Sequence, residues 1–76
     1  MTNEQFKAYL NRKANAFRDE IRKAKEKGEA VTTMEDALSQ LETALRIMNY
    51  SSGPAARRFK RDYLRRLAGR GITPEI

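Results

Sequence analysis

Residues 33–50 read TMEDALSQLETALRIMNY, and the spacing of their apolar side chains decides the fold. The intervals are four, three, four and three residues, at Met34, Leu38, Leu41, Leu45 and Met48, with Ala37, Ala44 and Ile47 beside this stripe. They match the 3.6-residue turn of an α-helix, so the pattern predicts a helix with one buried face. Thr32 and Glu35 have the spacing of a capping box, in which each side chain accepts a hydrogen bond from the other residue's backbone N–H. We therefore expect this helix to begin just after Thr32.

A longer helix is predicted before this one, over residues 3–27. Its apolar positions are four, four, three, four and three residues apart, at Phe6, Leu10, Ala14, Phe17, Ile21 and Ala24, and Tyr9 widens their face. Thr2 and Gln5 form another capping-box pattern at its start. Gly28 stands where a C-terminal cap with left-handed backbone is expected.

A third helix is predicted over residues 54–68. Pro54 suits the first position of a helix, because the N–H that proline lacks has no partner there. The apolar face of this helix consists of Ala56, Phe59, Tyr63, Leu64 and Leu67. The helix should end near Gly69 and Gly71, and the tail over residues 72–76 is expected to be frayed.

These three amphipathic helices lie in a chain of 76 residues, which is enough for one small domain. No stretch has a convincing strand pattern. The fold class is therefore predicted to be all-α, as a small three-helix bundle or as a helical hairpin with the third helix docked on it. At 1.5 Å per residue, the first helix spans ~37 Å and is too long for the others to cover. Its uncovered end is a candidate surface for homodimerisation.

Cysteine and histidine are both absent from the sequence. The chain therefore has no disulfide framework and no thiolate metal site, and it lacks the commonest general base and metal ligand. No nucleophile–base pair, phosphate loop or calcium loop replaces them. We expect a non-enzymatic protein with no catalytic residues, cofactor, metal site or small-molecule substrate.

No apolar run approaches the ~18 residues that a membrane span needs. Residues 1–4 do not form a basic segment followed by an apolar one, as in a secretory signal. We expect a cytoplasmic protein, in a bacterial or host cell. A basic amphipathic helix can lie on anionic lipid, but we do not expect a membrane partner, because so small a core needs the apolar residues of that helix.

The net charge of +6 is concentrated in the last third of the chain. Residues 1–29 carry a net charge of +3 and residues 30–53 of −2, whereas residues 54–76 carry seven basic against two acidic side chains, a net charge of +5. On a helical wheel, four arginines fall within about 100° of one another, opposite the apolar face. They are Arg57, Arg58, Arg61 and Arg65. Lys60, Arg66 and Arg70 are predicted to form the margin of this candidate anion-binding surface.

These arginines are predicted to bind the backbone of nucleic acid, DNA or RNA, without strong sequence specificity. A guanidinium group pairs bidentately with phosphate, and phosphate contacts provide affinity but no choice of sequence. The exposed face lacks the Asn and Gln side chains that read other base edges. Nucleic acid is therefore the first partner that we expect.

The same arginines could instead bind an acidic protein surface, because Arg is favoured at interface hot spots. The chain would then be an adaptor or inhibitor of a host protein or nucleoprotein complex. Its general build, short, basic and cysteine-free with an Arg-rich last helix, is similar to that of small phage or plasmid accessory proteins, including inhibitors of host machinery. No specific residue carries this likeness, so it transfers no site. A face that is merely solvated is the third interpretation.

Overall fold

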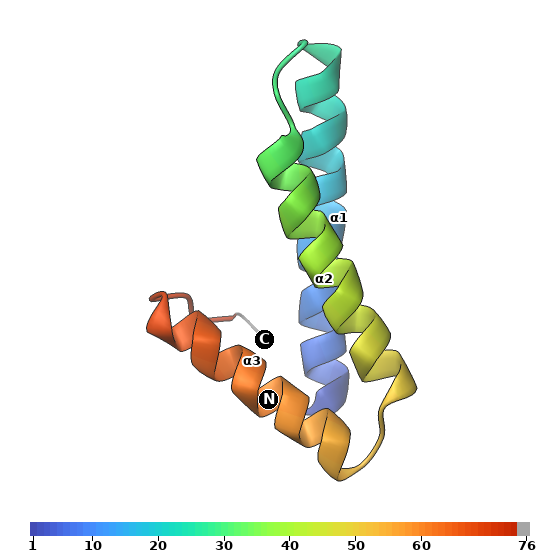
Figure 1. Ribbon diagram of the computed structural model, residues 1–76, viewed down its shortest axis with the longest axis vertical. Helices are drawn as coiled ribbons and strands as arrows, with labels where there is room; N and C mark the ends of the chain where they lie inside the picture. The colour runs from blue at the N-terminus through green and yellow to red at the C-terminus, as the bar shows by residue number, and fades with distance from the viewer. Residues whose placement is uncertain (75–76) are drawn as a thin grey trace.

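The computed structural model describes residues 1–74, which form three helices, α1 (Asn3–Glu26), α2 (Thr32–Tyr50) and α3 (Pro54–Gly69). The predicted all-α, three-helix fold is confirmed, and these described residues contain no strand. α1 and α2 lie side by side as an antiparallel hairpin (Figure 1). α3 runs obliquely across the end of the hairpin where α1 begins and α2 ends. The helical bundle is therefore a hairpin with the third helix docked at one end.

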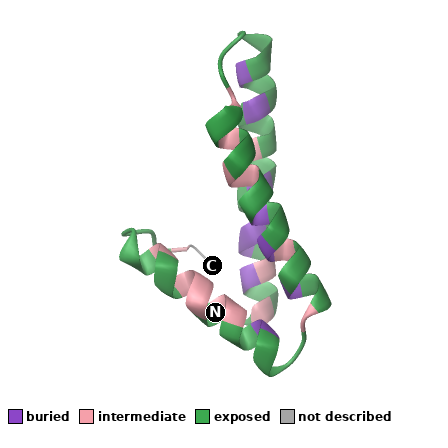
Figure 2. Ribbon diagram, viewed as in Figure 1, coloured by how far each residue is buried: buried purple, intermediate pink, exposed green. Residues whose placement is uncertain are grey.

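The core lies where the three helices meet. Its buried members are Phe6, Tyr9, Leu10, Ala14, Leu41, Ala44, Met48 and Ala56. Most buried residues lie in α1 and α2, whereas α3 is mainly exposed or partly buried (Figure 2). Ile21 and Ala24 continue the buried face of α1 towards the far end of the hairpin. The apolar spacing of α1 thus identified its buried face correctly.

The buried face of α2 is rotated relative to the predicted stripe. Ala44, expected beside the stripe, is only 2% exposed, whereas Leu38 and Leu45 within the stripe are partly buried. Ile47 is 37% exposed. Ala44 shares the lining of one hollow with Phe59 of α3. α2 is thus approached by α3 as well as by α1, and the oblique course of α3 shifts the buried face in a way that spacing cannot reveal.

Three aromatic rings join α3 to α1. Phe6 of α1 is fully buried, and its ring centroid lies 5.4 Å from that of Tyr63 in an edge-on contact. Phe59 lies 6.5 Å from Phe6 and 6.0 Å from Tyr63. Such tilted pairs add stability beyond the area that they bury. The Lys60 ammonium also donates a hydrogen bond to the Met1 carbonyl, at 2.9 Å, so polar and apolar contacts both place α3 against the start of α1.

The capping box predicted for α1 is present, and the one predicted for α2 is absent. At α1 the capping box is present, since the Gln5 N–H donates to Thr2 Oγ1 at 3.1 Å and the Thr2 N–H donates to Gln5 Oε1 at 2.8 Å. The prediction of a capping box at Thr32 is wrong. Val31 is the N-cap residue, without a side-chain cap, and its carbonyl accepts from the Glu35 N–H at 2.8 Å. Because α2 begins one residue early, the Thr32 hydroxyl lies inside the first turn and not before it.

The ends of α1 and α3 are closed by the same hydrogen-bond pattern. Gly28 has the predicted left-handed backbone, with φ of 72°, and the Glu29 N–H reaches back to the Ala24 carbonyl at 2.9 Å. After α3, the Ile72 N–H donates in the same way to the Leu67 carbonyl, also at 2.9 Å. This pattern is the Schellman motif. It turns residues 72–74 back towards α1, while residues 75–76 of the tail expected to be frayed lie outside the described residues.

Gly53 sets the direction in which α3 leaves the hairpin, and we expect Gly53→Ala to lower stability by about 1–3 kcal/mol. Its φ of 58° and ψ of −134° are open to glycine and strained for other residues. Nothing lies within 4 Å of an added Cβ, so the loss would come from the backbone alone. Gly69→Ala is the matched control, because Gly69 is helical with open space around it, and alanine should add ~0.5–1 kcal/mol there. Urea unfolding of both variants measures the contrast, and equal shifts would contradict it.

Candidate anion-binding surface

Four arginines lie on the face of α3 that is turned away from the core. Arg57, Arg58, Arg61 and Arg65 are all exposed, and we call them the outer Arg row. Opposite them, Ala56 is buried, and Phe59 and Tyr63 pack against the core. In a helix, residues four apart lie ~6 Å from each other along the axis. The side chains of Arg57, Arg61 and Arg65 therefore project from evenly spaced positions along one side of α3.

Acidic partners are scarcer beside the outer Arg row than beside several basic residues of α1. Carboxylates lie 3.0–3.7 Å from four basic side chains of α1, namely Lys7, Arg18, Arg22 and Lys25. The hydrogen bond from Arg22 lowers the pKa of Asp19 below its usual value. Within residues 1–74, the row has one such neighbour, Asp62, and it lies 3.9 Å from Arg61. The charge of the other three arginines is thus not compensated by the described part of the chain.

The beginning of α3 strengthens the positive field of the row. Glu4 and Glu35 occupy the first turns of α1 and α2, but the first turn of α3 has no acidic residue and no side-chain cap. The positive end of the helix dipole is therefore not neutralised. A shallow hollow at this end is lined by Pro54 and four basic residues, Arg57, Arg58, Lys60 and Arg61. An anion placed there would meet guanidinium groups and the helix dipole together.

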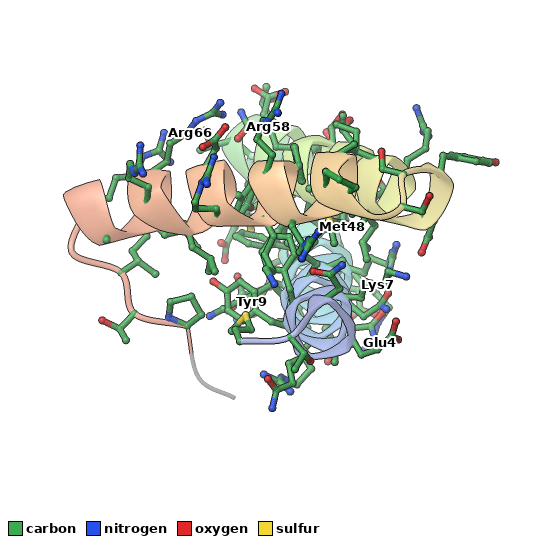
Figure 3. All side chains as sticks on the ribbon, turned by 90° about the horizontal axis from the view of Figure 1, so that it is seen from below. Glu4, Lys7, Tyr9, Met48, Arg58 and Arg66 are labelled. Carbon is green, nitrogen blue, oxygen red and sulfur yellow. The ribbon has the colours of Figure 1, made fainter. Side chains whose placement is uncertain are left out.

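The three residues predicted at the margin of the surface point in different directions. Lys60 is held by the Met1 carbonyl and faces α1. Arg66 lines a hollow beside α2 with Ser39 and other residues, and it lies, like Arg58, on the side of α3 away from Tyr9 (Figure 3). Arg70 lines a cavity on the inner side of α3. Lys60 therefore borders the row in the hollow at the start of α3, Arg66 lies on the same side of α3 as Arg58, and Arg70 lies apart on the inner side.

A second polar group, on the inner side of α3, was missed by the sequence interpretation. Tyr9, Lys13, Tyr63 and Arg70 line one cavity between α3 and the hairpin. The Lys13 ammonium lies 5.9 Å from the centroid of the Tyr9 ring. Burial raises the pKa of both phenols, and the neighbouring Tyr9 raises that of Tyr63 further, with Arg70 opposing. The available signal was the Tyr9–Lys13 spacing of four residues, which places a cation over a phenol on one face of a helix.

Neither a metal cluster nor a membrane span is formed by the described residues. Within residues 1–74, no three acidic or other metal-ligand side chains converge on one point. None of the three helices, over the same residues, combines the length and the apolar character that crossing a bilayer requires. The chain matches no protein-family model, no curated protein and no solved structure. The chemistry of the surface must therefore be argued from its own residues.

Proposed function

We propose that the chain is a non-enzymatic binding protein whose outer Arg row binds the phosphate backbone of nucleic acid. The observation that carries this proposal is the row of four exposed arginines, with Asp62 as the single acidic neighbour in the described residues. A face that serves solubility alone usually mixes both signs of charge. Arginine suits phosphate because its planar fork donates two parallel hydrogen bonds.

Binding is proposed to be largely independent of sequence. The outer face of α3 offers arginine, and phosphate contacts fix position without reading bases. The aromatic residues of α3, Phe59 and Tyr63, are engaged with Phe6 in the core and are not free to stack on single-stranded bases. A duplex backbone is therefore the better fit to this surface than a single strand held by stacking.

The salt dependence of binding tests the proposal directly. If each of the four arginines neutralises one phosphate, the log–log slope of the association constant against salt is about −3.6 for duplex DNA. Affinity should then fall about 150-fold between 50 and 200 mM salt. Titration of a labelled duplex, followed by anisotropy at several salt concentrations, measures the slope. Absence of binding at 50 mM salt would overturn the proposal.

An acidic protein surface is the alternative partner, and the same row would bind it. Copurification after nuclease treatment separates the two partner classes. A stoichiometric acidic protein that remains bound after nuclease treatment, together with no affinity for duplex DNA, would replace nucleic acid as the proposed partner. A homodimer through α1 is compatible with either partner and stays a prediction, which sedimentation over a wide concentration range can test.

A further inference from the structure

The inner side of α3 borders a cavity, open to solvent on one side, that is separate from the outer Arg row. All three helices and the segment after α3 contribute to its wall, and its volume is about 270 Å³. Its apolar part is formed by Phe17, Leu41, Leu67 and Ile72, from four different segments of the chain. Pockets for drug-sized ligands span roughly 300–1,000 Å³. This cavity, which we call the inner cavity, lies just below that range and so has room only for a ligand smaller than a drug-sized one.

The polar part of the inner cavity consists of cations and hydrogen-bond donors. Lys13 and Arg70 bring two positive charges, and Tyr9 and Tyr63 bring two phenols. No acidic side chain of residues 1–74 lines the inner cavity or the adjoining hollow, which shares Tyr9 and Lys13 with it. Both phenols are protonated at neutral pH, as tyrosine ordinarily is, and burial raises the pKa of each further, so each hydroxyl can donate a hydrogen bond. Every charged group in this wall therefore favours an anion.

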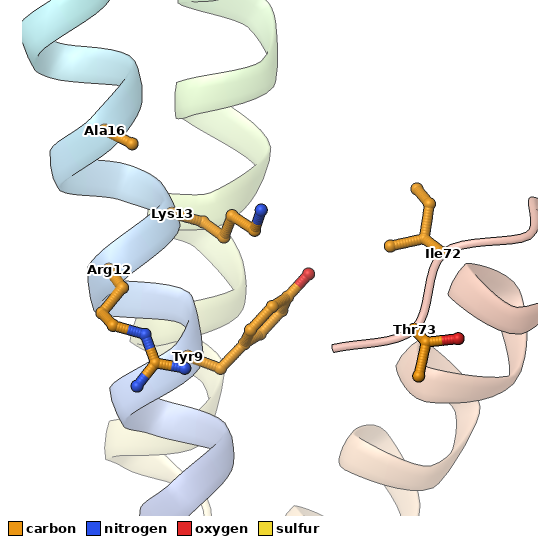
Figure 4. Close-up of a pocket in the computed structure, with 6 residues that line it drawn as sticks. All are labelled: Tyr9, Arg12, Lys13, Ala16, Ile72 and Thr73. Carbon is orange, nitrogen blue, oxygen red and sulfur yellow. The ribbon is translucent and has the colours of Figure 1, made fainter. Parts of the chain in front are cut away.

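Tyr9 is the residue that points most directly to a ligand. The residue is 5% exposed, and its hydroxyl, which has no hydrogen-bond partner among the described residues, is not sealed in the core but reaches solvent. Such a hydroxyl can donate a hydrogen bond to a bound ligand in place of water. Figure 4, a close-up of the adjoining hollow, shows the hydroxyl and the Lys13 ammonium extending into the space between α1 and the segment that carries Ile72 and Thr73. An unused donor and a cation thus face the same opening.

We propose that the inner cavity binds a small carboxylate with an apolar body, such as a medium-chain or aromatic acid. The apolar body would lie against Phe17, Leu67 and Ile72, whose burial on binding supplies the affinity. The carboxylate would accept hydrogen bonds from the two phenols, with the charges of Lys13 and Arg70 beside it. This site is independent of the proposed function, because no member of the outer Arg row lines the cavity.

Titration of the ¹⁵N-labelled full chain with octanoate, below its micelle concentration, tests the site. Octanoate should shift the amides of Tyr9, Phe17, Tyr63, Leu67 and Ile72 in a saturable way, with a dissociation constant of roughly 1 mM for so small a ligand. Octanol has a similar apolar body without the charge and should bind about tenfold more weakly. Octylamine, which carries the opposite charge, should leave these amides unchanged.

Two conservative variants and one control complete the experiment. Tyr9→Phe keeps the ring and removes the unused donor, and Arg70→Gln removes one charge at an exposed position. Each should weaken octanoate binding about tenfold, whereas Arg58→Gln on the outer Arg row should leave it unchanged and weaken DNA binding instead. Equal affinity for octanoate and octanol, unchanged affinity in both cavity variants, or shifts confined to the outer face of α3 would overturn the assignment.

Discussion

Replacing Arg57, Arg61 and Arg65 together by Glu is expected to lower the affinity for duplex DNA on the order of 10³-fold at 0.1 M salt. A slope of about −0.9 per phosphate means that each contact contributes roughly eightfold between 1 M and 0.1 M salt. The loss of three contacts then lowers affinity about 500-fold, and the repulsion of three carboxylates adds to this. Anisotropy titration with a labelled duplex measures the change.

The neutral variant, with the same three arginines changed to Gln, isolates the phosphate contacts. It should move the log–log salt slope from about −3.6 to about −0.9, because one arginine of the row, Arg58, remains. A slope that stays near its original value would show that other residues make the contacts. Affinity and slope together thus separate a specific row from a diffuse positive field.

A charge-matched variant of the hairpin controls for net charge. Lys23, Lys25 and Lys27 are exposed and lie at the end of α1, opposite the end of the hairpin that α3 crosses, and changing them to Glu alters the net charge by the same amount. Because screening limits charge effects to ~10 Å at 0.1 M salt, this variant should lose far less affinity than the triple variant of the outer Arg row. Equal losses in the two variants would contradict a localised site.

The sequence was sufficient to predict the helices and the face of α3 that carries the arginines. Periodicity alone identified the buried face of α1 and placed Phe59 and Tyr63 towards the core, where the structure has them. It succeeded because the apolar residues of an amphipathic helix recur about every 3.6 residues and so lie on its buried face. The outer Arg row follows from the same periodicity, since it is the side opposite these aromatic residues.

The features that the sequence did not predict depend on how the helices cross. Ala44 is buried because α3 approaches α2 obliquely, and the Lys60 ammonium donates to the Met1 carbonyl at the start of the chain. The inner cavity likewise draws Tyr9 from α1 and Arg70 from the end of α3, 61 positions apart in the chain. Contacts at such separations are set by the crossing angle of the helices, and the periodicity of one helix does not encode that angle.

Phe6→Ala is the single substitution expected to cost the most stability, because Phe6 lies at the junction of α1 and α3. A domain of this size is stable by roughly 4–11 kcal/mol, and removal of a fully buried phenylalanine costs about 3–5 kcal/mol. Phe6 also supplies the ring on which Phe59 and Tyr63 pack, so the outer Arg row would lose its support. We expect the melting temperature to fall by about 15–30 °C, as measured by circular dichroism.

Two further variants show whether this loss comes from the junction. Tyr50→Ala removes an aromatic side chain that is 87% exposed, and it should change stability by no more than ~0.5 kcal/mol. Phe6→Leu keeps an apolar side chain in the same place and should cost roughly 1–2 kcal/mol. If Phe6→Ala and Tyr50→Ala melted at the same temperature, the three rings could not be what holds α3 on the hairpin. The face that presents the outer Arg row would then need another source of rigidity, since no other aromatic contact joins α3 to the hairpin within residues 1–74.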